Sequence, residues 1–126
     1  MKKIRLENIA DAEILWKNND SLTYFGEQQI NFDFKNCDMI EIFYLERYGE
    51  NKVNSIRVPK GYDIMLQHTS TGLGGLGGFG ERVLTYSNSG YYVSSFKFKL
   101  LNNDGGINNI FVIPLYVLGY NTNLFS

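Results

Sequence analysis

The acidic side chains are the groups in this chain most able to carry out acid–base chemistry. Four of them cluster loosely in the first half of the chain and two stand apart: Asp33, Asp38, Glu41, Glu46, Asp63 and Glu81. A glycosidase needs two carboxylates that face one cleft about 5–10 Å apart. The spacing singles out no such pair, so solvated or turn-capping carboxylates are the favoured interpretation.

The chain holds a single histidine and a single cysteine. One histidine excludes the two-histidine metalloprotease motif, and one cysteine excludes an intramolecular disulfide and thiolate metal clusters. A catalytic triad would have to use His68 beside Thr69 and Ser70, but no G-x-S-x-G elbow occurs. Cys37 has only Lys35 as a basic neighbour and is predicted to be a small buried hydrophobe. We therefore predict no enzyme, no cofactor and no metal.

A glycine-rich tract spans residues 71–80. Residues 72–77 match G-x-G-x-x-G, but a predicted strand follows where a dinucleotide site needs a helix N-terminus, so cofactor binding is rejected. Large apolar residues recur at every third position of the tract: Leu73, Leu76 and Phe79. Two interpretations remain open: a subunit or partner contact formed on assembly, and a mobile surface loop.

Aromatic residues are abundant, with nine tyrosines and nine phenylalanines. Five lie in or beside predicted turns: Tyr24, Phe25, Tyr62, Tyr91 and Tyr120. Rings that carry hydroxyls suit stacking on sugars and also protein interfaces. We predict a binding role for these five, with packing of sheet edges as the alternative.

The elements that must position these residues are mostly strands. Residues 27–35 alternate between apolar and polar with period two, and 91–100 repeat the pattern with Tyr92, Phe96 and Phe98 on one face. Residues 39–45 are apolar on both faces except Glu41, as in a central strand. Shorter candidates cover 55–58, 63–67, 82–86 and 110–118, and a one- or two-turn helix is expected at 8–14.

Turn-forming clusters separate these runs. Residues 87–90 predict a hairpin, and Pro114 predicts an edge or a bulge in the last strand because proline cannot donate to a ladder. About eight short strands with regular turns predict an all-β fold, an antiparallel β-sandwich or jelly roll with a single domain. Trp16 is expected to pack between the sheets, and Gln29 and Asp33 to stabilise turns.

Length and charge limit the remaining functions. The 126 residues fit one domain, and twelve basic against thirteen acidic residues leave a net charge of −1. A basic surface for phosphates is missing, so no nucleic-acid partner is expected. The longest apolar run, 110–118, is too short for a membrane helix, and the first residues lack a signal-peptide core. Synthesis in the cytoplasm and no membrane insertion are expected.

An ordered set of short motifs runs along nearly the whole chain. The motifs come in this order along the chain: Leu15-Trp16-Lys17-Asn18, Phe25, Gln28 to Asp33, Asp38 to Ile42, Arg82-Val83 and Ile113 to Gly119. This order, over residues 14–120, resembles the C-terminal β-sandwich domain of bacteriophage tail-fibre and minor structural proteins.

The resemblance implies a non-enzymatic virion component, often a homotrimer, that meets the host surface and is assembled in the bacterial cytoplasm. Residues 1–13 would form an N-terminal arm and 14–126 the virion module. Partners would be other virion proteins of tail or capsid and a host-surface glycan. Two alternatives stay open: a capsid-decoration or head-fibre protein, and a lectin-like carbohydrate-binding module.

Overall fold

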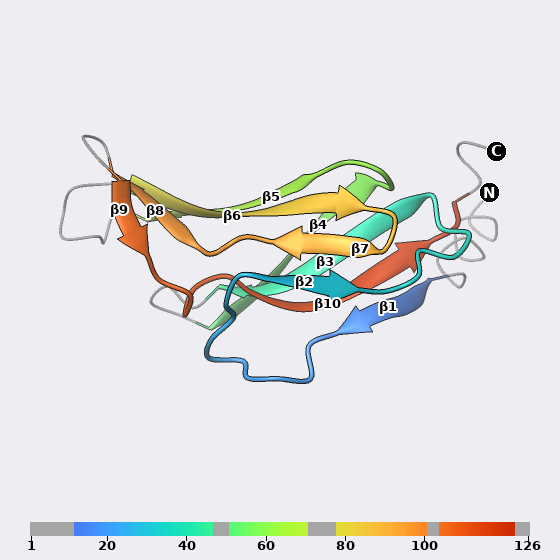
Figure 1. The fold of residues 1–126 in the computed structure, drawn as a ribbon, viewed down its shortest axis with the longest axis horizontal. Coiled ribbons are helices and arrows are strands. Elements are labelled where there is room, and N and C mark those ends of the chain that lie inside the picture. Colours follow the sequence, from blue (N-terminus) through green and yellow to red (C-terminus); the bar gives the residue numbers. More distant parts are fainter. Residues whose placement is uncertain (1–11, 47–50, 71–77, 101–103, 123–126) are drawn as a thin grey trace.

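The chain folds as an antiparallel β-sandwich, as predicted. The computed structural model describes residues 12–46, 51–70, 78–100 and 104–122, which form ten strands and no helix. In chain order these are β1 (Glu13–Lys17), β2 (Gln28–Asn31), β3 (Met39–Glu46), β4 (Lys52–Pro59), β5 (Ile64–Ser70), β6 (Gly78–Ser87), β7 (Gly90–Val93), β8 (Lys97–Leu100), β9 (Asp104–Ile107) and β10 (Ile113–Tyr120). They make one sheet of four strands and one of six (Figure 1).

Within the described part of the chain, no helix is available to span a membrane.

The four-stranded sheet has the order β1-β10-β3-β4. β3 lies between two neighbours, which confirms that residues 39–45 form a central strand. Its residues Ile40 and Ile42 are fully buried, whereas Phe43 points to the outer face of the sheet and is half-buried. In β10 the register shifts between Pro114 and Tyr116, which confirms the predicted bulge at the proline.

The six-stranded sheet is built around the long strand β6. β5 pairs along one edge of β6, from Gly78 to Leu84. On the other edge β8 pairs with 78–81 and β7 with 84–87, so these two short strands follow one another along the same edge. β2 continues the sheet beyond β7, and β9 continues it beyond β8. The hairpin predicted at 87–90 is confirmed as the β6–β7 turn, with Gly90 at φ 134°.

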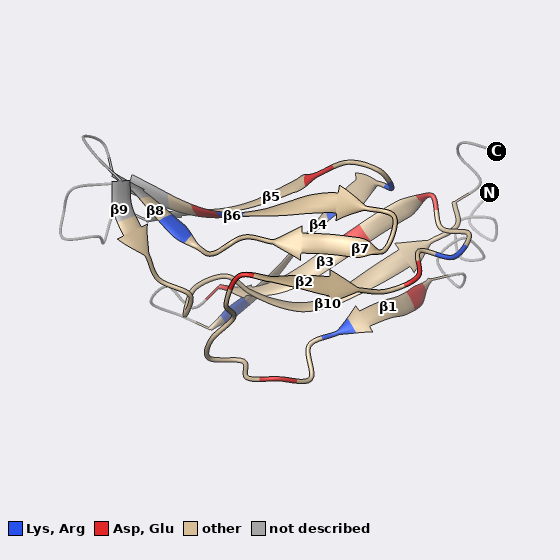
Figure 2. Cartoon of the chain, viewed as in Figure 1, with Lys and Arg blue, Asp and Glu red and all other residues tan. Residues whose placement is uncertain are grey.

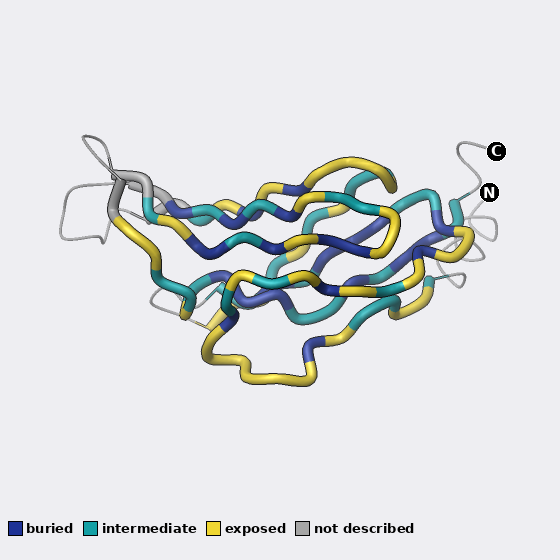
Figure 3. Tube along the Cα trace, viewed as in Figure 1, coloured by how far each residue is buried: buried dark blue, intermediate teal, exposed yellow. Residues whose placement is uncertain are grey.

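The core lies between the two sheets. Buried and exposed positions alternate along the strands, as Figure 3 shows. Two glycines make room for core side chains. A Cβ at Gly80 would lie 1.9 Å from Cζ of Phe96, and a Cβ at Gly119 would lie 2.3 Å from Sγ of Cys37. Both positions therefore require glycine for packing rather than for a turn.

The predicted strand 91–100 is interrupted at residues 94–96, and the interruption changes the phase of alternation by one residue. Before it, Tyr91 and Val93 point into the core and Tyr92 is 42% exposed; after it, Phe96 is fully buried. The prediction that Tyr92 shares a face with Phe96 is therefore wrong. An extra residue in one strand moves every later side chain to the other face.

The guanidinium of Arg82, on β6, fills this interruption. Arg82 is fully buried and donates five hydrogen bonds of 2.7–3.3 Å to main-chain carbonyls, those of Ser94, Asn109, Phe111 and Val112. Its guanidinium carbon lies 5.5 Å from the ring centroid of Phe25. Burial lowers the pKa of Arg82 to about 10. In the sequence Arg82 stands out only as part of the motif order, and nothing local predicts its burial.

Arg82 also holds a strained segment in place. Val112 adopts a φ of 53°, a left-handed conformation that is costly for a β-branched residue. Its carbonyl accepts the shortest of the arginine hydrogen bonds, at 2.7 Å. Asn109 contributes further, because its Oδ1 accepts from the amide of Phe96 at 2.9 Å. The segment before β10 is thus fixed by a cation from the middle of the opposite sheet.

Other element predictions need correction. The strand predicted at 27–35 ends at Asn31, although Phe34 remains buried and Asp33 exposed as the alternation required. The helix predicted at 8–14 is wrong where it is described, because Glu13 and Ile14 begin β1, paired with β10. Residues 8–11 lie outside the described residues. β9 forms although Asp104, Gly105 and Gly106 are turn-forming residues, because its pairing with β8 overrides that propensity.

Candidate functional site

The five aromatic residues predicted to bind a partner do not share one surface. Tyr24 and Tyr62 are 57% and 63% exposed, in the β1–β2 loop and the β4–β5 connection. Phe25, Tyr91 and Tyr120 are buried. For these three the burial favours the alternative interpretation, in which the rings pack within the sandwich, and the binding role of the set stays a prediction.

Each of the buried rings has a structural reason for its place. Phe25 packs edge-on against Trp16 at 6.2 Å and lies beneath Arg82. Tyr91 lies in an aromatic cluster with Phe34, with ring centroids 5.7 Å apart. Tyr120 donates its hydroxyl to Oε1 of Glu41 at 2.6 Å. Trp16 packs against the core, as predicted.

The three apolar residues of the glycine tract cannot be placed as a contact surface. Leu73 and Leu76 lie outside the described residues. Phe79 lies in β6 with its backbone opposite Thr69 and Lys99, and its side chain is outside the described part. The two interpretations of the tract remain predictions.

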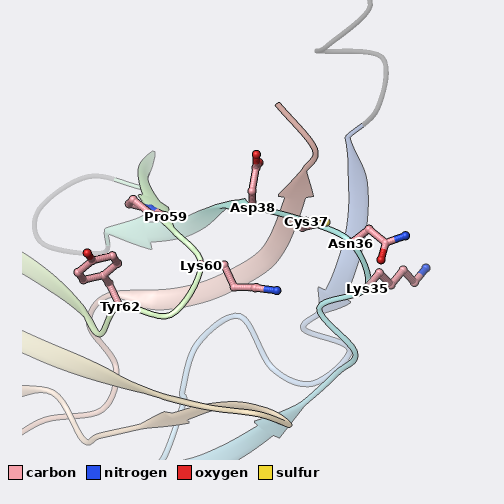
Figure 4. Close-up of a pocket in the computed structure, with 7 residues that line it drawn as sticks. All are labelled: Lys35, Asn36, Cys37, Asp38, Pro59, Lys60 and Tyr62. Atoms are coloured by element: carbon pink, nitrogen blue, oxygen red, sulfur yellow. The ribbon is translucent and has the colours of Figure 1, made fainter. Parts of the chain in front are cut away.

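Tyr62 lies at a shallow pocket of about 590 Å³. Two connections that are distant in sequence line it: the segment between β2 and β3, and the end of β4 with the residues that follow. The lining residues are Lys35, Asn36, Cys37, Asp38, Pro59, Lys60 and Tyr62 (Figure 4). A volume of this size lies within the range of sites that hold one small ligand.

The first wall is fixed by a tight turn before β3. Lys35 has a left-handed φ of 55°, and its amide donates to Oδ1 of Asp33 at 2.7 Å. The amide of Cys37 donates to the carbonyl of Phe34 at 3.2 Å. Asp33 therefore stabilises a turn, as predicted, and Asn36 at the tip of the turn is exposed.

The second wall is tied to Asp38 of the first wall, and Asp38 is bound to the end of β10. The amide of Lys60 donates to the carbonyl of Asp38 at 3.0 Å, and the amide of Asp38 donates to the carbonyl of Tyr120 at 2.9 Å. The Asp38 carboxylate accepts from the amide and the hydroxyl of Thr122 at 2.9–3.0 Å. Gly61 turns the chain with a φ of 104°. These hydrogen bonds hold both walls in place and do not involve the side chains of Lys60 and Tyr62.

The two lysines of the pocket differ in their ion pairing. Lys35 is paired with Glu13, with Nζ 2.8 Å from Oε2, and this hydrogen bond raises the pKa of Lys35. In Figure 4 Lys35 extends away from the pocket, whereas Lys60 extends from the second wall toward the first. Within the described ranges, the Lys60 ammonium takes part in no hydrogen bond or ion pair.

The pocket chemistry suits binding. Cys37 is buried, and burial raises the pKa of its thiol, so it is a poor nucleophile at neutral pH. This agrees with its prediction as a buried hydrophobe. The remaining groups are a ring, an amide, an ammonium and a carboxylate engaged by Thr122. They offer hydrogen bonds and one uncompensated positive charge.

The acidic residues serve structural contacts, and positive and negative residues are interspersed over both sheets (Figure 2). Asp63 accepts from the amide of Tyr86 at 2.8 Å, a contact that joins the residue before β5 to β6. Glu46 accepts from Asn54 at 3.0 Å and lies 3.3 Å from Nδ1 of His68. This cross-sheet pair was missed because its members are on strands of different sheets. Among the described residues no group of three or more potential metal ligands is found.

The Glu41 carboxylate accepts hydrogen bonds from three side chains. It accepts from Tyr120 at 2.6 Å, from Ser55 at 2.7 Å and from Arg57 at 3.2 Å. Burial alone would raise the pKa of Glu41, but these three hydrogen bonds outweigh burial and lower it. The cluster lies on the outer face of the four-stranded sheet and stabilises that face.

The residues that carry the resemblance to phage fibre domains make internal contacts. Asn18 donates from Nδ2 to the carbonyl of Pro114 at 2.9 Å and from its amide to Leu115 at 2.8 Å. Asp38 binds Thr122, and Arg82 binds four carbonyls. The motif residues therefore make contacts within the fold. Lys60 and Tyr62, whose side chains line the pocket, do not belong to the motifs.

Comparisons with protein-family models, with curated proteins and with solved structures find no match to this chain.

Proposed function

We propose that this chain is a non-enzymatic structural module of a bacteriophage virion that contributes to attachment to the host surface. The polar interior contacts of the β-sandwich coincide with the motif residues of the resemblance. The fold is of the kind that the resemblance implies, which supports the proposal.

The observation that carries the proposal is the pocket beside Tyr62. Its walls are preorganised by main-chain hydrogen bonds, while Lys60 and Tyr62 stay exposed. A preorganised concave site with few polar groups suits recognition of a ligand from solution. Weak binding at one such site becomes strong attachment when several copies act together.

Self-association, as a homotrimer, is part of the proposal. The outer face of the four-stranded sheet carries Phe43 stacked on Tyr116 at 4.6 Å, with Ile14 and Val53 more than half exposed near its edges. Outward residues of a solvated antiparallel sheet are usually polar, and exposed apolar patches usually mark contacts. A mass of 14.4 kDa that does not change with concentration in light scattering would contradict this part.

Labelling of intact phage particles tests the proposal. Antibodies against the purified chain, viewed by electron microscopy, should bind at the tail tip and should block adsorption to host cells. Label on the head shell would favour the capsid-decoration alternative. Particles without label would leave the lectin-like module, which the pocket also supports, as the remaining candidate.

A further inference from the structure

We infer that the pocket between the β2–β3 turn and the β4–β5 connection binds a single saccharide unit that carries one anionic group, a carboxylate or a phosphate. The inference rests on the proposed function and names the ligand class of its binding site. Lys60 holds the anionic group, and the ring of Tyr62 packs against the sugar.

The Lys60 ammonium supplies the charge. It extends over the pocket in Figure 4, and its backbone is fixed by the 3.0 Å hydrogen bond to Asp38. The other pocket lysine, Lys35, is already neutralised by Glu13. An ammonium ion held over a pocket without a counter-ion favours an anion, and such charge-assisted hydrogen bonds are about twice as strong as neutral ones.

The balance of charge limits the ligand to one negative charge. Besides Lys60, the pocket carries the Asp38 carboxylate, and Asp33 and Glu13 lie beside the first wall. Lys60, which is in no ion pair among the described residues, can compensate one negative charge of a ligand, and the nearby carboxylates repel any further negative charge. Nucleic acid and polyphosphates are therefore poor ligands, whereas a sugar acid or a sugar phosphate diester fits.

The apolar side of the pocket supplies the surface for the sugar ring. Tyr62 is 63% exposed and lies on the same side of the pocket as Pro59, across from Lys35 and Asn36 (Figure 4). The C–H face of a hexose packs on such a surface, and its hydroxyls reach the Tyr62 hydroxyl and the Asn36 amide. The opposed walls are suited to a ring with one apolar face and a polar rim.

Calorimetric titration of the full chain tests the inference. The probes are galacturonic acid, the methyl phosphodiester of glucose 6-phosphate, neutral galactose and inorganic phosphate. We expect galacturonic acid or the sugar phosphodiester to bind at least about fivefold more tightly than galactose. The two anionic probes distinguish a carboxylate from a phosphate ligand.

Matched variants assign the binding to this pocket. Lys60→Met and Tyr62→Ala should each weaken binding about tenfold. Lys97→Met on β8 and Tyr92→Ala on β7 remove an exposed lysine and an exposed tyrosine elsewhere and should leave affinity unchanged. Unchanged thermal unfolding of all four variants shows that the fold is intact.

Three results would overturn the inference. They are no binding of either anionic sugar, binding that both pocket variants leave unchanged, and inorganic phosphate bound as tightly as the sugars with no effect of Tyr62→Ala. These outcomes are distinct from failure of the proposed function. A virion protein labelled at the tail tip can still lack this ligand, and a sugar-binding chain can be absent from particles.

Discussion

Two cations of this molecule show how differently a positive charge is used in one sandwich. Arg82 is fully buried, and its guanidinium donates five hydrogen bonds to carbonyls. Lys60 lies at an open pocket, and no hydrogen bond or ion pair from the described residues holds its ammonium. Removing Arg82 should damage the fold, whereas removing Lys60 should change only what the pocket binds.

Of the variants that test this contrast, Arg82→Met should have the largest effect on the free energy of unfolding. It leaves four carbonyls without their donor, and we expect a loss of about 4 kcal/mol in the free energy of unfolding. Lys60→Met should stay within about 0.5 kcal/mol of the wild type. Urea denaturation of both variants measures the difference. If the two variants were equally stable, Arg82 would not contribute more to the fold than Lys60 does.

Gly80→Ala tests the region around Arg82 through packing. The added Cβ would overlap the ring of Phe96, 1.9 Å from its Cζ, and we expect a loss of about 2–3 kcal/mol. The double variant Gly80→Ala/Phe96→Leu should recover part of the loss, because the smaller side chain leaves space. Losses that simply add in a double-mutant cycle would argue against the contact.

Glu41 lies between the two extremes, since it is buried while its partner Arg57 is 56% exposed. Its pKa is lower in the folded state than its ordinary value of 4.5. Its contribution is therefore complete above about pH 4.5 and is lost as the pH falls through the folded pKa. Glu41→Gln should cost about 1–2 kcal/mol at pH 7 and should flatten the loss of stability below about pH 4.5. The prediction would be contradicted if stability fell equally with decreasing pH in the wild type and in Glu41→Gln.

Tyr91→Phe gives the smallest expected effect. Among the described residues, the Tyr91 hydroxyl is a buried side-chain group without a hydrogen-bond partner, in contrast to the saturated guanidinium of Arg82. Burial raises the pKa of this hydroxyl. Its removal should leave stability unchanged or raise it by up to about 1 kcal/mol. A thermal melt in which the variant is clearly less stable would reveal a partner for the hydroxyl.

Sequence alternation predicted the sandwich because it is a local signal. Other local signals identified single elements: an apolar run predicted the central strand 39–45, turn-forming residues predicted the hairpin at 87–90, and proline predicted the bulge at Pro114. Alternation failed at residues 94–96, beside the guanidinium of Arg82 from another strand. A run of strand-forming residues carries no local trace of a side chain that reaches it through tertiary structure.

The candidate site was only partly predictable for the same reason. Tyr62 was predicted from its place beside a turn, but Lys60 and Asn36 resembled ordinary solvated turn residues. The pocket forms because Lys60 of the β4–β5 segment binds Asp38 of the β2–β3 segment, and Asp38 is bound to Tyr120. Phe25 and Tyr91 carried the same sequence signal as Tyr62, and only packing separates core rings from exposed ones.

The position of β10 determines when the protein can complete its folding. β10, the last of the described strands, inserts between β1 and β3, and it pairs Glu13 with Gly119. During translation the edges of β1 and β3 stay unpaired until β10 has left the ribosome, so the four-stranded sheet closes only after that point. Contacts of such sequence separation slow folding and leave unpaired strand edges exposed to aggregation. A nascent chain that stops before residue 113 therefore has no means of closing this sheet.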